Sequence, residues 1–584
     1  MLGPSCGTRW GTVTRSELFS SSQAFGSFAV AIAPCSTTET LHGLLESPTV
    51  VGPFARDLSA SVAVLVSPQS SQRFGRVGSE VVMLAVVRSS TLLGVDGFPV
   101  HVEVHVANGL PSFTIVGLPD ASCRESRDRA RAAISTSGLK WPDKRITVNL
   151  APTNLRKAGS ALDLAVAIGV LVASDQLGPD LITDFGFLGE LGLNGALRPI
   201  VGALPLVHAL GEVRPVVPPG SFREALLVGR DPVTAGSLLG VVDALKGKAP
   251  WDTLDPNDTP ESLIVETSDL IDVQGQPVAK RALEVAAAGG HHVLMTGPPG
   301  AGKTMLAERL PTLMPDLDDR SAFEVSRIHS AAGRFHELDL IRRPPLRAPH
   351  HSASLVALLG GGTSALRPGE VSMASDGVLF LDELGEFPTG HLDALRQPLE
   401  SGEIHIARAS ASAVMPARFL LVAATNPCPC GVGKWGDCRC SAAALTRYAR
   451  RLSGPLLDRF DIRLAVDPPD HRKVLTGDHN GPTSAEVRTR VSRARAMALS
   501  RGVHTNRELA ASAIDRHAPL TLPAKGYLRR LLEDGTMSMR GVQRLRLMAL
   551  TIRDLESEEG PVDEVDLAEA MLLRGGDRQV GVAS

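Results

Sequence analysis

The sequence contains no apolar run of the roughly 18 residues that a helix needs to cross a bilayer. The nearest candidate, 161–173, is shorter and carries Asp163, so it is better interpreted as a buried helix. Charge of one sign is not in excess either, because 60 Lys and Arg residues face 63 Asp and Glu residues and leave a formal net charge of −3. We therefore predict no membrane association, and any nucleic-acid-binding surface must be local.

Secretory features are equally scarce. Arg9 and Arg15 precede a Ser-rich stretch that has no continuous apolar core, which argues against a signal peptide. Seven cysteines in 584 residues, four of them clustered, do not suit a disulfide scaffold. We therefore expect a cytoplasmic protein whose length allows about three or four domains.

The first 82 residues differ in composition from the rest. They are rich in Ser, Gly, Pro and Val and show no sustained helical period, which predicts a weakly ordered extension over 1–82. Met83 is the first methionine after Met1, and patterned sequence begins there. Translation from Met83 is one hypothesis and a genuine flexible tail is the other; the intact mass of the native protein would distinguish them.

A phosphate-binding loop is the strongest motif in the chain. It consists of Gly297, Pro298, Pro299, Gly300, Ala301, Gly302, Lys303 and Thr304. A predicted strand at 292–295 precedes it and a predicted helix at 305–310 follows it, which is the context the motif requires. Backbone N–H groups and the helix N-terminus would hold the phosphates of ATP or GTP. Lys303 would reach the β- and γ-phosphates, and Thr304 would ligate Mg²⁺.

Two further apolar strands end in polar residues suited to hydrolysis. The run at 378–381 leads into Asp382 and Glu383, where Asp382 would hold Mg²⁺ through water and Glu383 would act as general base toward the attacking water. The run at 419–424 ends near Asn426, whose side chain would contact that water or the γ-phosphate, the role called sensor 1. The sequence therefore predicts hydrolysis as well as binding.

Two arginines complete the predicted catalytic set. Arg459 follows a short predicted helix in the segment PLLDRFD, and an arginine that reaches a γ-phosphate stabilises charge in the transition state. Arg540 lies in SMRG at the start of a later predicted helix and is a candidate for sensor 2. Taken alone, either arginine is better interpreted as a surface or salt-bridging residue. Their order along the chain is what favours the catalytic interpretation.

This order of motifs resembles the AAA+ superfamily, and the long segments resemble one branch of it. RAPHHSASLVALLGGG (347–362), RPGEVSMASDGVLFLDELGEF (367–387) and ITVNLAPTNLRKAGSALDLAVAIGVL (146–171) are closely similar to the magnesium-chelatase-like ATPases of the ComM and YifB type. The segment GLPDASCRESRDRARAAI (117–134) is similar to the same family. The likeness extends from Met83 to the C-terminal helices.

The resemblance implies an α/β protein built from three domains. They are a domain similar to the Lon protease domain at 83–248, an AAA+ core with a parallel sheet at 263–468, and a C-terminal helical lid at 469–584. A linker at 249–262 joins the first two. Strands are expected at 100–106, 112–116 and 146–150 and helices at 124–135 and 161–173, with Asn108-Gly109 predicting a hairpin.

The family also implies an assembly and a substrate. Its members form homo-hexameric rings with ATP between subunits, so that Arg459 would act in trans. A helix-2 insert around 355–367 and a β-hairpin around 404–418 would face the ring centre. Such proteins act on single-stranded or branched DNA, promoting branch migration in recombination or natural transformation, with recombination proteins as candidate partners. Arg408 near the hairpin tip is a candidate phosphate contact, although a solvated arginine is the alternative.

The block at 83–248 lacks the residues for proteolysis. Ser160 falls in the region of the serine nucleophile of Lon-type proteases. When the segment from Gly189 to Pro205 is matched to the segment that carries the lysine base in those proteases, Leu204 takes the place of the lysine. A serine without an adjacent base is a weak nucleophile. We therefore expect this domain to serve assembly or substrate guidance.

Four cysteines lie within thirteen residues after the sensor 1 strand. Cys428, Cys430, Cys438 and Cys440 form a C-x-C…C-x-C set that suits a tetrahedral Zn²⁺ site, with free reduced thiols or a redox pair as alternatives. The adjacent His350 and His351 are interpreted as a packing feature at the base of the insert.

ATP-driven action on DNA is the favoured function, with ATP and Mg²⁺ as cofactors and Zn²⁺ as a further candidate. A protein remodeller or a magnesium-chelatase-type metal-insertion ATPase is the alternative, and the extra N-terminal domain argues against the chelatase. Glu383, Asn426 and Arg459 together argue against a scaffold with little turnover, and Leu204 against an ATP-dependent protease.

Overall fold

The computed structural model describes residues 83–254, 268–362, 365–408, 411–433, 436–451, 454–468, 481–535 and 537–575. The predicted extension at 1–82 therefore lies outside the described residues. So do most of the predicted linker and the first residues of the predicted lid.

The N-terminal block is built around a seven-stranded mixed sheet with the order β3-β4-β2-β1-β5-β8-β9. Its strands are β1 (Met83–Leu93), β2 (Asp96–Ala107), β3 (Ser112–Val116), β4 (Arg145–Ala151), β5 (Phe185–Phe187), β8 (Arg214–Val217) and β9 (Val233–Thr234). The helices are α1 (Ala121–Thr136), α2 (Asp163–Ala173), α3 (Ala203–Ala209), α4 (Phe222–Leu226) and α5 (Leu238–Leu245), and β6 (Glu190–Leu191) pairs with β7 (Leu197–Arg198).

Helix α2 is buried along its whole length, as the apolar segment predicts. Alternate residues of β2 face the core from Val100 onward, which is the period-two pattern of a strand with one buried face. The hairpin predicted at Asn108-Gly109 is wrong. Strand β2 pairs with β1 on one edge and with β4 on the other, and β3 pairs in parallel with β4. The chain after Asn108-Gly109 therefore enters β3, which is separated from β2 by β4, and does not pair with β2.

The central block has a five-stranded sheet with the order β11-β14-β17-β10-β18, and every pair in it is parallel. The strands are β10 (Val293–Thr296), β11 (Leu346–Arg347), β14 (Val378–Leu381), β17 (Leu420–Thr425) and β18 (Ile462–Ala465). Helices α6 (Pro277–Gly289), α7 (Lys303–Leu313) and α8 (Asp319–Ala331) belong to the same block. Every residue of β14 and β17 is buried, as expected for parallel strands covered on both faces.

Two small elements project from this block. One consists of α9 (Leu355–Leu359) and the paired strands β12 (Gly360–Gly361) and β13 (Arg367–Pro368), where the helix-2 insert is predicted. The other is the antiparallel hairpin of β15 (Glu403–Arg408) and β16 (Ala411–Pro416), which begins just after α12 (Arg396–Ser401). Leu358 of the insert and Ile404 of the hairpin belong to one buried cluster, so the two elements pack together.

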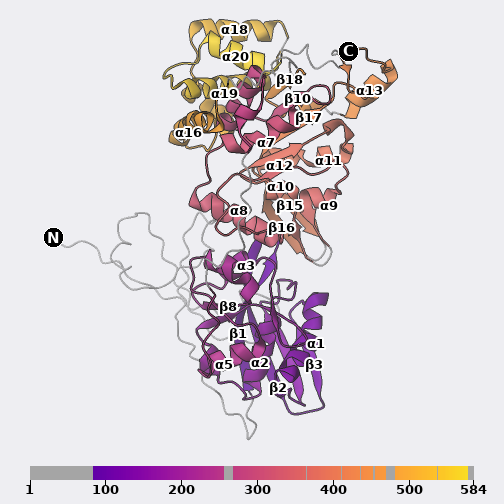
Figure 1. Ribbon diagram of the computed structural model, residues 1–584, viewed down its shortest axis with the longest axis vertical. Coiled ribbons are helices and arrows are strands. Elements are labelled where there is room, and N and C mark those ends of the chain that lie inside the picture. The colour runs from indigo at the N-terminus through magenta and orange to yellow at the C-terminus, as the bar shows by residue number, and fades with distance from the viewer. Residues whose placement is uncertain are drawn as a thin grey trace, which may run out of the picture. The chain divides into compact units, whose positions relative to one another are not determined.

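The C-terminal region is helical. It comprises α16 (Ser484–Ser500), α17 (Ile514–His517), α18 (Leu522–Glu533), α19 (Met539–Glu556) and α20 (Glu564–Leu573). These helices lie together in Figure 1, where their colours run from orange to yellow. Their apolar residues share a core cluster with α6, α7 and the central sheet. Among the described residues, no helix combines the length and apolarity that a membrane span requires.

Candidate functional site

A cavity of about 350 Å³ lies at the carboxyl edge of the parallel sheet. The phosphate loop follows β10, Asp382 and Glu383 follow β14, and Asn426 follows β17. Carboxyl ends of parallel strands meet at one edge, so the three motifs converge although they are far apart in sequence. The structure thus brings together the predicted residues that line this cavity: Pro299, Gly300, Ala301, Gly302, Lys303, Thr304, Asp382, Glu383 and Asn426.

Lys303 is a buried cation in the wall of this cavity. Its Nζ donates to the carbonyl oxygens of Gly297 at 2.7 Å and Pro298 at 3.0 Å, and to Asn426 Oδ1 at 3.2 Å. Burial lowers the pKa of the lysine, while the carboxylates of Asp382 and Glu383 oppose that shift. The ammonium group is therefore held over the loop by acceptors that a phosphate oxygen can replace.

The two acidic residues differ in their partners. Asp382 Oδ2 accepts a hydrogen bond from Thr304 Oγ1 at 2.9 Å, so the hydroxyl and carboxylate predicted to ligate Mg²⁺ already face one another. Glu383 has a left-handed backbone with φ of 51°. Its Oε2 lies 3.3 Å from Nδ1 of His351. The ring of His351 also packs against that of His350, with centroids 4.0 Å apart. His351 therefore contacts the predicted general base, which the packing interpretation missed.

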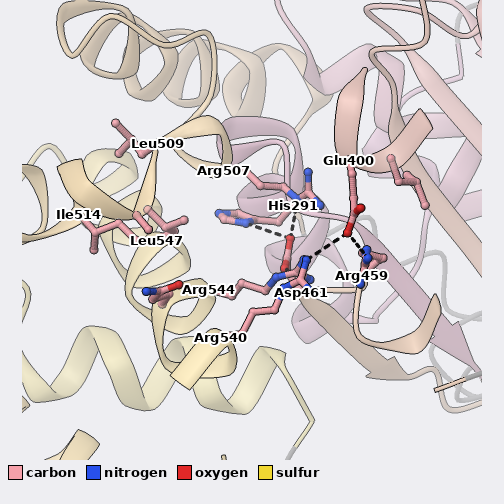
Figure 2. A pocket seen from close by; sticks show the side chains of 13 residues that line it. His291, Glu400, Arg459, Asp461, Arg507, Leu509, Ile514, Arg540, Arg544 and Leu547 are labelled. Carbon is pink, nitrogen blue, oxygen red and sulfur yellow. Dashed lines mark hydrogen bonds and ion pairs between the residues drawn. The ribbon is translucent and has the colours of Figure 1, made fainter. Parts of the chain in front are cut away.

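A second cavity, of about 400 Å³, holds the two predicted arginines (Figure 2). It shares no lining residue with the first. Four guanidinium groups, those of Arg459, Arg507, Arg540 and Arg544, line it together with the carboxylates of Glu400 and Asp461. The arginines outnumber the carboxylates by two, so the cavity has an excess of positive charge.

Asp461 neutralises the inner part of this cavity. It is buried and accepts hydrogen bonds from Arg507 at 2.9 Å and Arg544 at 3.1 Å. Burial alone would raise the pKa of Asp461, but Arg507, His291 and Arg544 outweigh it and hold the pKa well below its usual range. Asp461 is therefore a fixed anion that positions the arginines around it.

Glu400 is the shared partner of the two predicted catalytic arginines. One of its oxygens, Oε1, accepts a hydrogen bond from Arg459 and a longer one of 3.4 Å from Arg540. Arg459 is largely buried, with 10% of its side chain exposed, whereas 52% of Glu400 and 57% of Arg540 are exposed. Arg540 lies in the first turn of α19, after the N-cap Ser538.

The second cavity belongs to the amino edge of the sheet. His291 precedes β10, and Asp461 precedes β18, which pairs in parallel with β10. The phosphate loop follows β10, so the two cavities lie at opposite ends of a four-residue strand that spans about 13 Å. The structure therefore separates Arg459 and Arg540 from the phosphate loop of their own chain.

The four predicted zinc ligands do lie together. The sulfur atoms of Cys428, Cys430, Cys438 and Cys440 are all within 4.8 Å of one another. The Sγ atoms of Cys428 and Cys430 lie 3.2 Å apart, and each lies 3.7 Å from Sγ of Cys438. Thiolates bound to one tetrahedral zinc ion at about 2.3 Å would lie about 3.8 Å apart, so the donor set and its spacing fit zinc.

Arg408 is the last residue of β15, and its side chain is exposed. A Cβ added at Gly361 of β12 would lie 3.5 Å from Nη2 of Arg408, so the arginine is beside the insert. The hairpin predicted at 404–418 is thus present, with its outermost residues beyond the described ones.

The N-terminal residues make contacts unlike those of a serine–lysine pair. The Ser160 hydroxyl donates to a carboxylate oxygen of Glu190, and Lys157 Nζ donates to the carbonyl of Pro152. Leu204 is buried in α3. The described contacts of Ser160 therefore supply no amine base.

Comparison with known proteins finds family models that match most of the chain between residues 102 and 574. The family model described as "Magnesium chelatase, subunit ChlI" covers residues 269–474, "Subunit ChlI of Mg-chelatase" covers 102–219, and "Magnesium chelatase, subunit ChlI C-terminal" covers 481–574. The competence protein ComM of Haemophilus influenzae is 43% identical over 498 residues, which span 84% of this chain and 97% of that protein.

Other relatives cover the chain to different extents. The uncharacterized protein YifB of Escherichia coli is 41% identical over 498 residues, which span 85% of this chain and 98% of that protein. The magnesium-chelatase 38 kDa subunit of Cereibacter sphaeroides is 26% identical over 249 residues, which span 38% of this chain and 71% of that subunit.

Proposed function

The chain belongs to the magnesium-chelatase-like AAA+ family that includes ComM and YifB, and we propose that it is an ATP-hydrolysing ring motor that acts on DNA. The observation that carries this proposal is the division of the catalytic residues between two cavities at opposite edges of one sheet. Each cavity holds only part of a hydrolytic site, which suits an enzyme that completes its sites between subunits.

The first cavity supplies the nucleotide-binding half. Lys303 would exchange its carbonyl partners for oxygens of the β- and γ-phosphates, and Asn426 would then be released toward the attacking water. Glu383 would accept a proton from that water as general base. Thr304 and Asp382 would hold Mg²⁺, which would neutralise charge on the phosphates.

The second cavity supplies the half that acts in trans. Arg459 and Arg540 lie at the opposite edge of the sheet from the phosphate loop of their own chain, which supports a role toward the γ-phosphate of a neighbouring subunit. The unbalanced positive charge favours a phosphate there. Head-to-tail contacts of this kind form a ring when the rotation between neighbouring subunits closes, and we propose a closed homo-hexamer.

DNA is the proposed substrate for two reasons. ComM, named a competence protein, matches this chain over nearly its whole length, which supports natural transformation and recombination as settings. Arg408 extends from a hairpin that, with the adjacent insert, would face the centre of the ring, where six copies would meet the DNA backbone. A motor that follows the backbone needs phosphate contacts rather than contacts to base edges.

Branch migration is the activity to assay. Full-length protein is incubated with a labelled four-way DNA junction and ATP. The conversion of the junction to two duplexes is followed by gel electrophoresis. We expect conversion with ATP, and none with the Glu383→Gln variant, which retains the nucleotide-binding loop. A wild-type protein that hydrolyses ATP but leaves junction, fork and single-stranded substrates unaltered and unbound would contradict the DNA proposal.

A chelatase-type metal-insertion ATPase or a protein remodeller remains the second candidate. A model described as a chelatase subunit covers 102–219, so the N-terminal domain does not by itself argue against the chelatase, contrary to the sequence-based expectation. Coverage favours the DNA motor, because the chelatase subunit spans 38% of this chain and ComM spans 84%. ATP hydrolysis indifferent to DNA would favour the second candidate.

We further propose that the four-cysteine cluster holds Zn²⁺ as a structural ion. Its ligands would clamp the segment that follows Asn426 and thereby fix the end of β17 beside the nucleotide. The N-terminal block is proposed to be a non-proteolytic, Lon-like domain that serves assembly or substrate guidance, because the hydroxyl of Ser160 is engaged with Glu190 and Leu204 is apolar.

A further inference from the structure

We propose that Glu400 is a positioning residue that occupies the two trans-acting arginines until a neighbouring γ-phosphate displaces it, and that it links this exchange to the β15–β16 hairpin. This inference rests on the proposed function, because it assigns Arg459 and Arg540 to the γ-phosphate of a neighbouring subunit. It goes beyond that function by naming the group with which the phosphate competes.

The contacts of Glu400 are those of an anion that a phosphate can replace. A carboxylate oxygen that accepts from two guanidinium groups makes the same kind of charge-assisted contact that a phosphate oxygen would make. Glu400 brings together arginines that lie 59 and 140 residues away in the sequence, one after α14 (Gly454–Leu457) and one on α19. Figure 2 shows the Glu400 carboxylate beside these arginines. In the single subunit, Glu400 therefore occupies the place that we assign to an external anion.

Glu400 contrasts with Asp461 in the same cavity. Asp461 is buried and engaged by Arg507 and Arg544, so removing it would deprive two partly buried cations of the carboxylate they share. Glu400 is half exposed and holds the more exposed Arg540 at 3.4 Å. The Glu400–Arg540 contact is therefore open to water, and such an ion pair is weak and readily exchanged. The Glu400–Arg459 contact is the closer one, and its arginine is largely buried. Asp461 is thus suited to hold Arg507 and Arg544 in place, and Glu400 is suited to release Arg459 and Arg540.

The position of Glu400 in the chain connects it to the hairpin. It lies in the last turn of α12, and the next residues, Ser401 and Gly402, lead directly into β15. The Ser401 hydroxyl donates to the carbonyl of Glu403 at 3.0 Å, and Ala417 N donates to the Gly402 carbonyl at 2.8 Å. Gly402 has φ of 71°, which favours glycine at this bend.

Glu400 also lines a cavity of about 580 Å³ whose wall includes Gly402 and Ala417 at the base of the hairpin. The carboxylate thus belongs both to the arginine cavity and to the wall beneath the hairpin that carries Arg408. When the arginines turn to a neighbouring γ-phosphate, the end of α12 loses its two cationic partners. The same residue would therefore report nucleotide binding at one interface to the DNA-contacting hairpin of its own subunit.

The test compares ATP hydrolysis by full-length wild type, Glu400→Gln, Glu400→Asp and Arg459→Ala, each with and without a four-way DNA junction. Glutamine keeps the size of the side chain and removes its charge. We expect Glu400→Gln to lower KM for ATP by about threefold to fivefold, the range of an exposed ion pair, because a competitor for the arginines is removed. We also expect it to raise hydrolysis without DNA, so that the ratio of rates with and without DNA falls.

Three controls separate this role from a structural one. Glu400→Asp keeps the charge and should retain most of the DNA stimulation. Glu400→Gln combined with Arg459→Ala should be as inactive as Arg459→Ala alone, because Glu400 acts through that arginine. Glu564→Gln removes a half-exposed carboxylate paired with Arg530 in the helical region and should leave KM and DNA stimulation unchanged.

The outcomes are distinguishable. A wild type without hydrolysis would overturn the proposed function and the role of Glu400 together. Hydrolysis that depends on Arg459, with Glu400→Gln unchanged in KM and DNA stimulation, would overturn the Glu400 proposal alone. Loss of hydrolysis in Glu400→Gln as complete as in Arg459→Ala would also contradict it, since Glu400 would then hold the arginine in its active position.

Discussion

Among single residues, Asp461 is a buried carboxylate whose removal should cost substantial stability. We expect Asp461→Asn to lower the free energy of unfolding by about 3–5 kcal/mol, because Arg507 and Arg544 would keep their charges without a buried partner. Denaturant unfolding at neutral pH measures this effect. Asp515→Asn, which removes an 89% exposed carboxylate paired with Arg546, is the matched control and should change little. Equal stability of the two variants would contradict the assignment.

The same residue makes a pH-dependent contribution. The pKa of Asp461 is depressed in the folded chain, so its stabilisation is present above the unfolded pKa of about 3.9 and is lost as the pH falls below that value. The asparagine variant does not titrate there. The difference in free energy of unfolding between wild type and Asp461→Asn should therefore narrow as the pH falls. A difference that widens as the pH falls would contradict this prediction.

The residue scale also shows what the sequence could predict. Lys303, Asp382, Glu383 and Asn426 were placeable because each directly follows, or lies in the loop that follows, an apolar strand. Glu400 carries no such signal, because its partners are 59 and 140 residues away and only the fold brings them together. His351 lies next to Glu383 for the same reason, since β11 and β14 are neighbours in the sheet.

Among the elements, the cysteine loop offers a direct metal test. We expect about one zinc ion per chain in protein prepared without chelators, and loss of that zinc in Cys438→Ser, because three thiolates make a weaker site than four. Atomic emission measures the metal, and chelation should lower the melting temperature. Cys123→Ala, which changes a buried cysteine of α1, should keep its zinc. Metal-free wild type with normal stability would contradict the zinc proposal.

The β15–β16 hairpin carries the DNA prediction. Charge reversal in Arg408→Glu should weaken DNA binding at low salt and reduce the slope of log affinity against log salt, by about one for each phosphate that the protein no longer neutralises. Fluorescence anisotropy across a salt series measures both quantities. Arg530→Glu makes the same charge change on α18 and should retain wild-type binding. Unchanged affinity and slope in Arg408→Glu would remove this arginine from the DNA surface.

The elements also show where local patterns fail. The hairpin at 404–418 is expected from the family resemblance, and its two strands are adjacent in sequence and pair with each other. Asn108-Gly109 has an equally strong local signal, yet β3 pairs with β4 from beyond α1, because both edges of β2 are taken by β1 and β4. The residues of a turn indicate that the chain changes direction there. Which strands then pair with each other depends on the arrangement of the whole sheet.

For the whole molecule, division of each site between subunits predicts complementation. Glu383→Gln and Arg459→Ala should each abolish hydrolysis alone. In mixed rings, about a quarter of the interfaces would pair an intact Glu383 with an intact Arg459 from the neighbour, so partial activity should return. Differently tagged variants, co-purified to establish mixing, provide the measurement. Mixed rings that stay inactive would indicate that Arg459 serves its own chain.

The most direct test of the ATP-driven DNA motor is the rate of ATP hydrolysis by the full-length chain, with and without single-stranded, duplex and branched DNA, against Glu383→Gln. We expect hydrolysis that DNA stimulates in the wild type and that is absent from the variant, which should still bind nucleotide through its intact loop. A rate that no DNA changes, or equal hydrolysis by Glu383→Gln, would contradict the proposed motor.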